Sequence, residues 1–147
     1  MIAFTRSINT IARCTMQYRS DKLNDLNISG PQATYILHVC HQPGITQDAL
    51  AKAIYVNKSN VTRQLNSLES AGYVQRQNSQ HDQRAVLVYP TKKAQELLPF
   101  IYQLFRDWNT YLTQDLTTEE QDVFFRLLQK ITKKAKQYVD QKQGDIR

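Results

Sequence analysis

The sequence predicts a mostly α-helical protein with a small β-wing, and three observations support this. Glycine and proline number only four each among 147 residues, so few loops are expected. Apolar residues recur at helical spacing near both ends of the chain. Between them, Thr46 to Thr91 has the pattern of a helix, a turn, a second helix and a two-stranded ribbon. This succession is the layout of a winged helix-turn-helix, flanked here by longer N- and C-terminal helices.

The composition is that of one ordinary folded domain, expected to cover residues 1–147. Hydrophobic residues make up 41% and charged residues 22% of the chain, which excludes a disordered protein. Two cysteines, Cys14 and Cys40, do not make a disulfide framework. No run of about 18 apolar residues is present, and the N-terminus lacks a signal-peptide core. We therefore expect no membrane partner and a cytoplasmic location.

The charge is mildly basic and unevenly distributed. The formal net charge is +6, which is compatible with a nucleic-acid partner. The segments Asn57 to Lys93 and Lys130 to Arg147 each hold six basic and two acidic residues, a net +4 apiece. The excess thus lies on the winged unit and on the C-terminal tail, where a solvated, frayed helix end is the simpler explanation.

The first two helices are predicted from apolar spacing and from a start signal. The first is expected over Phe4 to Arg19, and the polar stretch Ser20 to Asn27 should end it. Ser29-Gly30-Pro31 marks the start of the second helix, because proline is tolerated in a first turn. That helix should end at Pro43-Gly44.

The central helices are bounded by capping residues. Thr46 should cap the third helix, and either Asn57 or Ser59 should cap the fourth. Gly72 suits the position just after the fourth helix, which usually needs a left-handed backbone.

The wing follows directly. β-branched and aromatic residues predict strands at Val74 to Gln77 and at Ala85 to Tyr89. Pro90 should stop the second strand, and Thr91 should cap the fifth helix.

The outer helices predict a homodimer. Thr117 to Glu120 has the spacing of a capping box for a sixth helix, and wide apolar stripes follow both long helices. The first, fifth and sixth helices each carry an apolar stripe. The small winged lobe, residues 29–91, cannot cover all of these stripes. We therefore expect residues 1–20 and 92–140 to be dimerisation helices that pack on a second copy, the alternative being a monomeric bundle.

The start of the fourth helix offers side chains that suit DNA. Arginine reads guanine, asparagine and glutamine read adenine, and hydroxyl groups reach phosphates or base edges. The alternative is a polar face with capping residues. The candidate DNA-binding residues, expected to be exposed, are Asn57, Lys58, Ser59, Asn60, Thr62, Arg63 and Gln64.

Asp82 and Arg84 form a second candidate group at the ribbon tip. On an extended ribbon they point the same way, so the carboxylate could brace the wing. An arginine here could enter a narrow minor groove. The alternative is an exposed local ion pair of little energetic value.

Taken together, these segments resemble the MarR family of bacterial transcriptional regulators, and the likeness covers essentially the whole chain. The strongest part is the spacing of Arg63, Gly72, Arg76 and the Asp82/Arg84 wing. The resemblance rests on Val61-Thr62-Arg63, Leu68-Glu69-Ser70-Ala71-Gly72-Tyr73-Val74, Arg76, Asp82-Gln83-Arg84 and Pro90-Thr91-Lys92-Lys93-Ala94.

The resemblance implies a homodimeric repressor that binds a pseudo-palindromic operator in double-stranded DNA and releases it when a small ligand binds. It implies that Arg84 enters the minor groove and that Asp82 positions it. Arg76 joins the DNA-binding set as part of the same basic group. The chain departs from the family at Ala94, where glycine is common, and at Pro90.

Three signals are considered for such a regulator. A small aromatic or acidic ligand could bind between aromatic and polar groups, or those groups could simply be core packing. Cys14 could be a redox sensor, although Arg13 is its only near cation. His38 and His41 could share a metal, but without a carboxylate or thiol partner they are a weak signal. The candidate ligand-binding residues are Tyr18, Arg19, Tyr35, His38 and Trp108.

Two rival classes are weighed. An enzyme is not expected, because no phosphate loop, catalytic triad order or paired carboxylates occur. No cofactor is expected either. A winged-helix protein-interaction module without specific DNA binding is the second rival, and the basic set of Lys58, Arg63, Arg76 and Arg84 argues against it.

Overall fold

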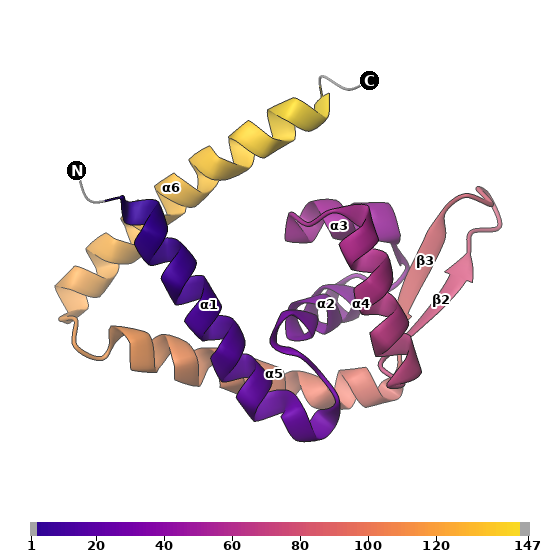
Figure 1. The fold of residues 1–147 in the computed structure, drawn as a ribbon, viewed down its shortest axis with the longest axis horizontal. Coiled ribbons are helices and arrows are strands. Elements are labelled where there is room, and N and C mark those ends of the chain that lie inside the picture. The colour runs from indigo at the N-terminus through magenta and orange to yellow at the C-terminus, as the bar shows by residue number, and fades with distance from the viewer. Residues whose placement is uncertain (1–2, 145–147) are drawn as a thin grey trace. The chain divides into compact units, whose positions relative to one another are not determined.

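The computed structural model describes residues 3–144, and it confirms a mostly helical fold with a small antiparallel sheet (Figure 1). The chain divides into two compact units, Met1–Trp108 and Asn109–Arg147. The elements are α1 (Phe4–Leu23), the 3₁₀ turn η1 (Asn24–Leu26), α2 (Gly30–His41), β1 (Ile45–Thr46), α3 (Gln47–Ile54), α4 (Lys58–Ser70), β2 (Val74–Asn78), β3 (Val86–Pro90), α5 (Lys92–Thr113) and α6 (Thr118–Gly144).

Side-chain caps start the central helices where the sequence predicts them. The Thr46 hydroxyl accepts the backbone N–H of Ala49 at 3.0 Å at the start of α3. At α4 the cap is Asn57 rather than Ser59, and its Oδ1 accepts the N–H of Asn60 at 2.7 Å. Each cap satisfies a backbone donor that the first helical turn leaves open.

The first helix is longer than predicted. We expected it to end at Arg19, but α1 continues to Leu23, whose side chain is fully buried. Burial of this leucine outweighs the polar character of the segment. The hydroxyl of Ser20 accepts the backbone N–H of Gly30 at 2.8 Å. A Cβ on Gly30 would lie 2.4 Å from the Met16 carbonyl oxygen, so only glycine permits this close crossing of α1 and α2.

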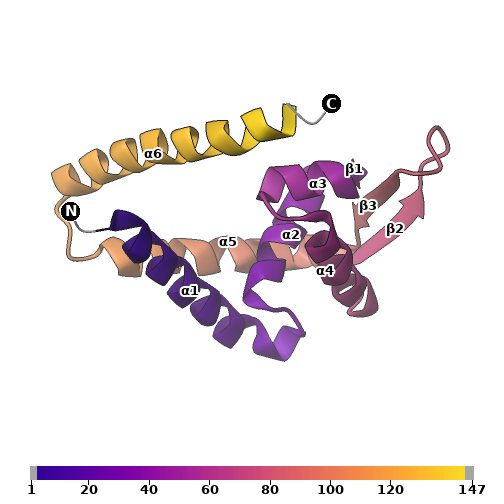
Figure 2. The same cartoon turned by 45° about the horizontal axis from the view of Figure 1, so that its top comes forward.

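The sheet has the strand order β1-β3-β2, and both pairings are antiparallel (Figure 2). Gly72 has φ of +84° directly after α4, as its predicted position requires. The chain then enters β2, where Val74 pairs with Pro90 of β3. Sequence analysis missed β1, because two residues are too short to show an alternating pattern.

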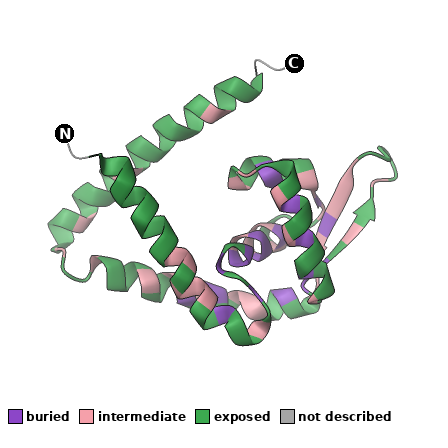
Figure 3. Ribbon diagram, viewed as in Figure 1, coloured by how far each residue is buried: buried purple, intermediate pink, exposed green. Residues whose placement is uncertain are grey.

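The buried core of the described chain belongs to Met1–Trp108 (Figure 3). Leu50, Val61, Leu65 and Leu68 pack inward from α3 and α4. Tyr35 and Tyr73 are the largest fully buried side chains. The helix-turn-helix therefore rests on a packed support that fixes α4.

In the second unit, the predicted capping box opens α6. The Thr117 N–H donates to the Glu120 carboxylate at 2.9 Å, and the Glu120 N–H donates back to the Thr117 hydroxyl at 3.2 Å. No α6 residue is buried within the described chain. The described helices include none that is long and apolar enough to cross a membrane.

Candidate nucleic-acid interface

The outer face of α4 presents polar and basic side chains to solvent. Lys58, Ser59, Thr62 and Arg63 are exposed on its first two turns, next to the Asn57 cap. Lys58 pairs with Asp48 at 3.1 Å, but both side chains are more than 60% exposed, so the pair adds little stability. This face has the composition of a surface that meets phosphates and base edges.

Two of the predicted residues differ from the rest. We expected Asn60 and Gln64 to be exposed, but both are half-buried because their amides contact α2. The Tyr35 hydroxyl donates to Oδ1 of Asn60 at 2.6 Å. The side-chain nitrogen of Gln32 donates to Oε1 of Gln64 at 3.0 Å. Side chains of α2 therefore hold these amides from behind.

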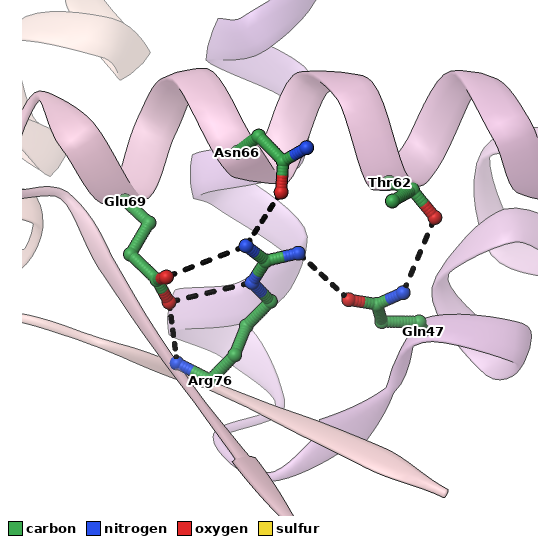
Figure 4. Close-up of polar contacts among 5 residues, drawn as sticks. All are labelled: Gln47, Thr62, Asn66, Glu69 and Arg76. Carbon is green, nitrogen blue, oxygen red and sulfur yellow. Dashed lines mark hydrogen bonds and ion pairs between the residues drawn. The ribbon is translucent and has the colours of Figure 1, made fainter. Parts of the chain in front are cut away.

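Arg76 lies in a hydrogen-bond network that joins β2, α3 and α4 (Figure 4). Its guanidinium donates to both carboxylate oxygens of Glu69 at 3.3 Å. It also donates to Asn66 at 2.6 Å and to Gln47 at 3.3 Å. The side chain is 19% exposed. Direct contact of Arg76 with DNA stays a prediction, whereas its role in bracing the wing against α4 is visible.

Glu69 is the acidic centre of this network. Hydrogen bonds from the Arg76 side chain hold the pKa of Glu69 below its ordinary value of 4.5, although partial burial acts in the opposite direction. The backbone N–H of Arg76 adds a further bond at 2.9 Å. The carboxylate therefore stays ionised and keeps the guanidinium in place.

The tip of the wing differs from the predicted extended ribbon. Residues 79–85 form a turn rather than strands, so Asp82 and Arg84 are not related by strand alternation. The Asp82 carboxylate instead accepts the backbone N–H of Arg84 at 3.0 Å. Within the described chain, the Arg84 guanidinium has no hydrogen bond or ion pair. Asp82 thus shapes the loop and leaves the arginine head group free.

The candidate ligand-binding residues are engaged in packing contacts. Tyr18 stacks on Trp108 with ring centroids 4.4 Å apart, and the Trp108 N–H donates to Thr15 at 2.8 Å. The Arg19 guanidinium lies 3.8 Å from the ring centre of Phe105. Tyr35 points instead toward α4. The structure therefore brings Tyr18 and Trp108 together, packs Arg19 on Phe105, and directs Tyr35 elsewhere.

The remaining candidate sensors have different surroundings. Cys14 is exposed, and burial raises the pKa of the half-buried Cys40 thiol. Burial, and then the charge of neighbouring His41, lower the pKa of His38. His41 bonds to the hydroxyl of Tyr102. No cluster of three or more metal-binding side chains occurs among residues 3–144.

Three residues that position this surface were missed by sequence analysis. Gln47 and Asn66 look like ordinary exposed polar residues, and only the fold shows that they hold Arg76. Gln32 did have a detectable signal, because it lies three residues after Ser29 in a capping-box spacing.

Comparison with known proteins agrees with this architecture. A family model described as the MarR family matches residues 26–85. The uncharacterized HTH-type transcriptional regulator YybA of Bacillus subtilis is 25% identical over 128 residues, covering 87% of this chain and 85% of the relative.

Solved structures extend the likeness to nearly the whole chain. A MarR protein from Peptoclostridium difficile is 26% identical with a TM-score of 0.88, covering 92% of this chain and 88% of that one. A MarR family regulator from Listeria monocytogenes, solved with a 26mer DNA, shares the fold at 23% identity and a TM-score of 0.84, covering 93% and 91%. The family model, the relative and the solved structures together support the MarR family of winged helix-turn-helix transcriptional regulators for this chain.

Proposed function

We propose that this protein is a homodimeric, sequence-specific DNA-binding regulator that represses its targets. The observation on which the proposal rests most is the outer face of α4, where exposed polar and basic side chains stand on a helix fixed by a buried core. A helix of this kind fits the major groove. The Listeria monocytogenes relative of the same fold was solved with DNA, which supports the proposal.

The wing supplies a second contact in this proposal. The Arg84 guanidinium is free of partners in the described chain and lies in the loop that joins β2 to β3. An unpaired arginine suits the negative potential of a narrow minor groove. Asp82 sets the loop from which it extends.

The apolar face of α6 supports a dimer. Val123, Phe124, Leu127 and Ile131 are each more than 40% exposed and recur at helical spacing. The outer half of α1 likewise exposes Phe4, Ile8 and Ile11. Such long apolar stripes are covered in a stable protein, and a second copy with two-fold symmetry would cover them. Two α4 helices would then meet half-sites about 10 base pairs apart.

Release by a small ligand is the regulatory part of the proposal. Tyr18 stacks on Trp108, and the Arg19 guanidinium lies over the Phe105 ring; aromatic surface and a positive charge of this kind suit an aromatic acid. Benzoate is a simple probe. Release of bound DNA by benzoate in wild type but not in Arg19→Gln would support this part, and equal release in both would contradict it. We propose no catalytic activity, and a cytoplasmic location.

Selection from a random duplex pool at physiological salt tests the function. Recovery of an inverted repeat would support a dimeric, sequence-specific regulator. Recovery of no motif, with binding that vanishes as salt rises, would contradict it and favour the protein-interaction module.

Leu127→Asp tests the dimer separately. It places a charge in the apolar face of α6, so it should yield a monomer that no longer binds the repeat tightly. Gln129→Asp is the matched control, because it adds the same charge two residues further, on nearly the opposite side of the helix. A monomeric Leu127→Asp protein with full affinity would contradict the dimer.

A further inference from the structure

Asn60 and Gln64 lie one turn apart on α4, and a buried α2 side chain engages the amide oxygen of each. The Tyr35 hydroxyl donates to Oδ1 of Asn60 at 2.6 Å, and Nε2 of Gln32 donates to Oε1 of Gln64 at 3.0 Å. Tyr35 is 1% exposed and Gln32 is 5% exposed. Both donors are therefore fixed in the interior, behind the helix that we propose reads DNA.

A backbone group determines which way Gln64 faces. The N–H of Ser29 can only donate, so the atom of Gln32 that accepts it, at 2.9 Å, must be the oxygen Oε1. The nitrogen of Gln32 is consequently the atom that faces Gln64. Because an amide nitrogen does not accept, Gln64 must present its oxygen toward Gln32 and direct its own nitrogen away.

The hydrogen bond itself orients Asn60. The Tyr35 hydroxyl donates to Oδ1 of Asn60 at 2.6 Å, so the amide oxygen faces the buried tyrosine and the nitrogen faces away from it. Burial raises the pKa of Tyr35, although the positive charge of Arg63 opposes that rise, so the hydroxyl keeps the proton that it donates.

Both amide nitrogens remain available to a partner. Neither Nδ2 of Asn60 nor Nε2 of Gln64 donates a hydrogen bond within residues 3–144. No buried side-chain nitrogen or oxygen among those residues lacks a partner, so both nitrogens are open to solvent. Each amide therefore offers N–H donors to solvent while its acceptor faces the protein interior.

We propose that α4 reads DNA through Asn60 and Gln64 as hydrogen-bond donors only, and that Tyr35 and Gln32 are the positioning residues that impose this polarity. In the major groove guanine shows two acceptors, thymine shows one, adenine pairs an acceptor with a donor, and cytosine shows a donor. An unrestrained amide matches adenine, whereas a donor-only amide matches guanine and then thymine. The inference rests on the proposed DNA-binding function, which it deepens.

Gln32→Glu tests the effect on Gln64. Glutamate keeps the capping box with Ser29, but its carboxylate accepts where the amide nitrogen donated. Gln64 must then turn its nitrogen inward and its oxygen outward. The preferred base opposite Gln64 should shift from guanine to adenine or cytosine, by about fivefold or more.

Tyr35→Phe tests the effect on Asn60. Loss of the hydroxyl releases Oδ1, so adenine should gain on guanine opposite Asn60 by about fivefold. Tyr73→Phe is the matched control. Tyr73 is also 1% exposed, and its hydroxyl donates to the Leu26 carbonyl at 2.8 Å rather than to α4. It should lose stability with no change of base preference.

Binding of the full chain and of these variants is measured by fluorescence anisotropy. The duplexes are based on the selected operator and carry each of the four bases at the positions opposite Asn60 and Gln64. A shift of base preference in both α2 variants, absent in Tyr73→Phe, supports the inference. Equal losses on all four bases, or a wild-type preference for adenine at both positions, would overturn it while the proposed function stands.

NMR of the free protein separates the inference from the proposed function. The side-chain amide protons of Gln64 should exchange rapidly with water in wild type and become protected in Gln32→Glu. Protection already present in wild type would overturn the orientation of Gln64, whether or not DNA binds. If wild type selected no motif, the proposed function would be contradicted. The reading of bases by Asn60 and Gln64 would then be contradicted as well.

Discussion

The α4 surface, residues 57–66, and the wing loop, residues 79–85, are both proposed to meet DNA, but they are held in place differently. On α4, Asn60 and Gln64 are bonded to buried side chains of α2, and Asn66 is bonded to Arg76. In the wing loop the bonds are local, such as that between the Asp82 carboxylate and the Arg84 N–H. An open hollow of about 470 Å³ lies between this loop and the start of α3.

This contrast indicates which region should supply base specificity and which should supply affinity. A side chain that is oriented before binding loses little freedom on contact, so α4 should discriminate between bases. A free arginine on a loop adapts to the shape and potential of a groove, so the wing should add affinity and salt dependence. Substitutions that remove the support of α4 should therefore lower stability, whereas substitutions in the wing loop should lower DNA affinity.

The largest expected effect on stability is that of Arg76→Ala. It removes the guanidinium that joins Glu69, Asn66 and Gln47, and so weakens the connection between β2 and α4. The free energy of unfolding should fall by about 1.5–3 kcal/mol, the range for hydrogen bonds to charged groups. Urea denaturation measures this. Arg84→Ala is the control and should change stability by no more than about 0.5 kcal/mol. Equal losses of unfolding free energy in Arg76→Ala and Arg84→Ala would contradict the proposed difference between the two regions.

The next effect concerns DNA affinity. Arg84→Ala should weaken binding to the selected operator by about 1–2 kcal/mol and flatten the salt dependence by about one unit. Arg84→Lys keeps the charge but loses the planar fork, so it should retain the salt slope and only part of the affinity. Titrations at several salt concentrations measure both quantities. An unchanged slope in Arg84→Ala would place the wing away from DNA.

The sequence predicted the features that depend on neighbouring residues. The caps at Thr46 and Thr117, and the turn at Gly72, involve partners within three or four positions, so their spacing is visible along the chain. The helices and the wing followed from these signals and from apolar periodicity.

Contacts between distant segments were not predictable in this way. Arg76 and Gln47 are 29 positions apart, and Tyr35 and Asn60 are 25 apart. Nothing in the residue types shows that one pair forms a brace or that the other orients an amide. The sequence thus identified the polar residues of the surface, whereas the fold alone shows which of their atoms are already occupied.

Stability at acidic pH should depend on the same brace. The pKa of Glu69 is lowered in the folded protein, mainly by hydrogen bonds from Arg76. A depressed pKa stabilises the fold above the ordinary value of 4.5, and this contribution is lost as pH falls through the folded pKa. Glu69→Gln keeps an acceptor but does not titrate, so its stability should fall less between pH 5 and pH 3. Parallel curves for the two proteins would contradict this.

The smallest effect should come from Asp82. Asp82→Ala removes an exposed bond to the Arg84 N–H and should lower the free energy of unfolding by about 0.5 kcal/mol. Asp82→Asn keeps an acceptor oxygen and should restore the loop. It also removes a negative charge beside the proposed DNA surface, so it should bind the operator more tightly than Asp82→Ala, and at least as tightly as wild type. If Asp82→Asn bound the operator as weakly as Asp82→Ala, the negative charge of Asp82 would be the property that matters. The hydrogen bond that shapes the turn would then not explain why an aspartate occupies this position.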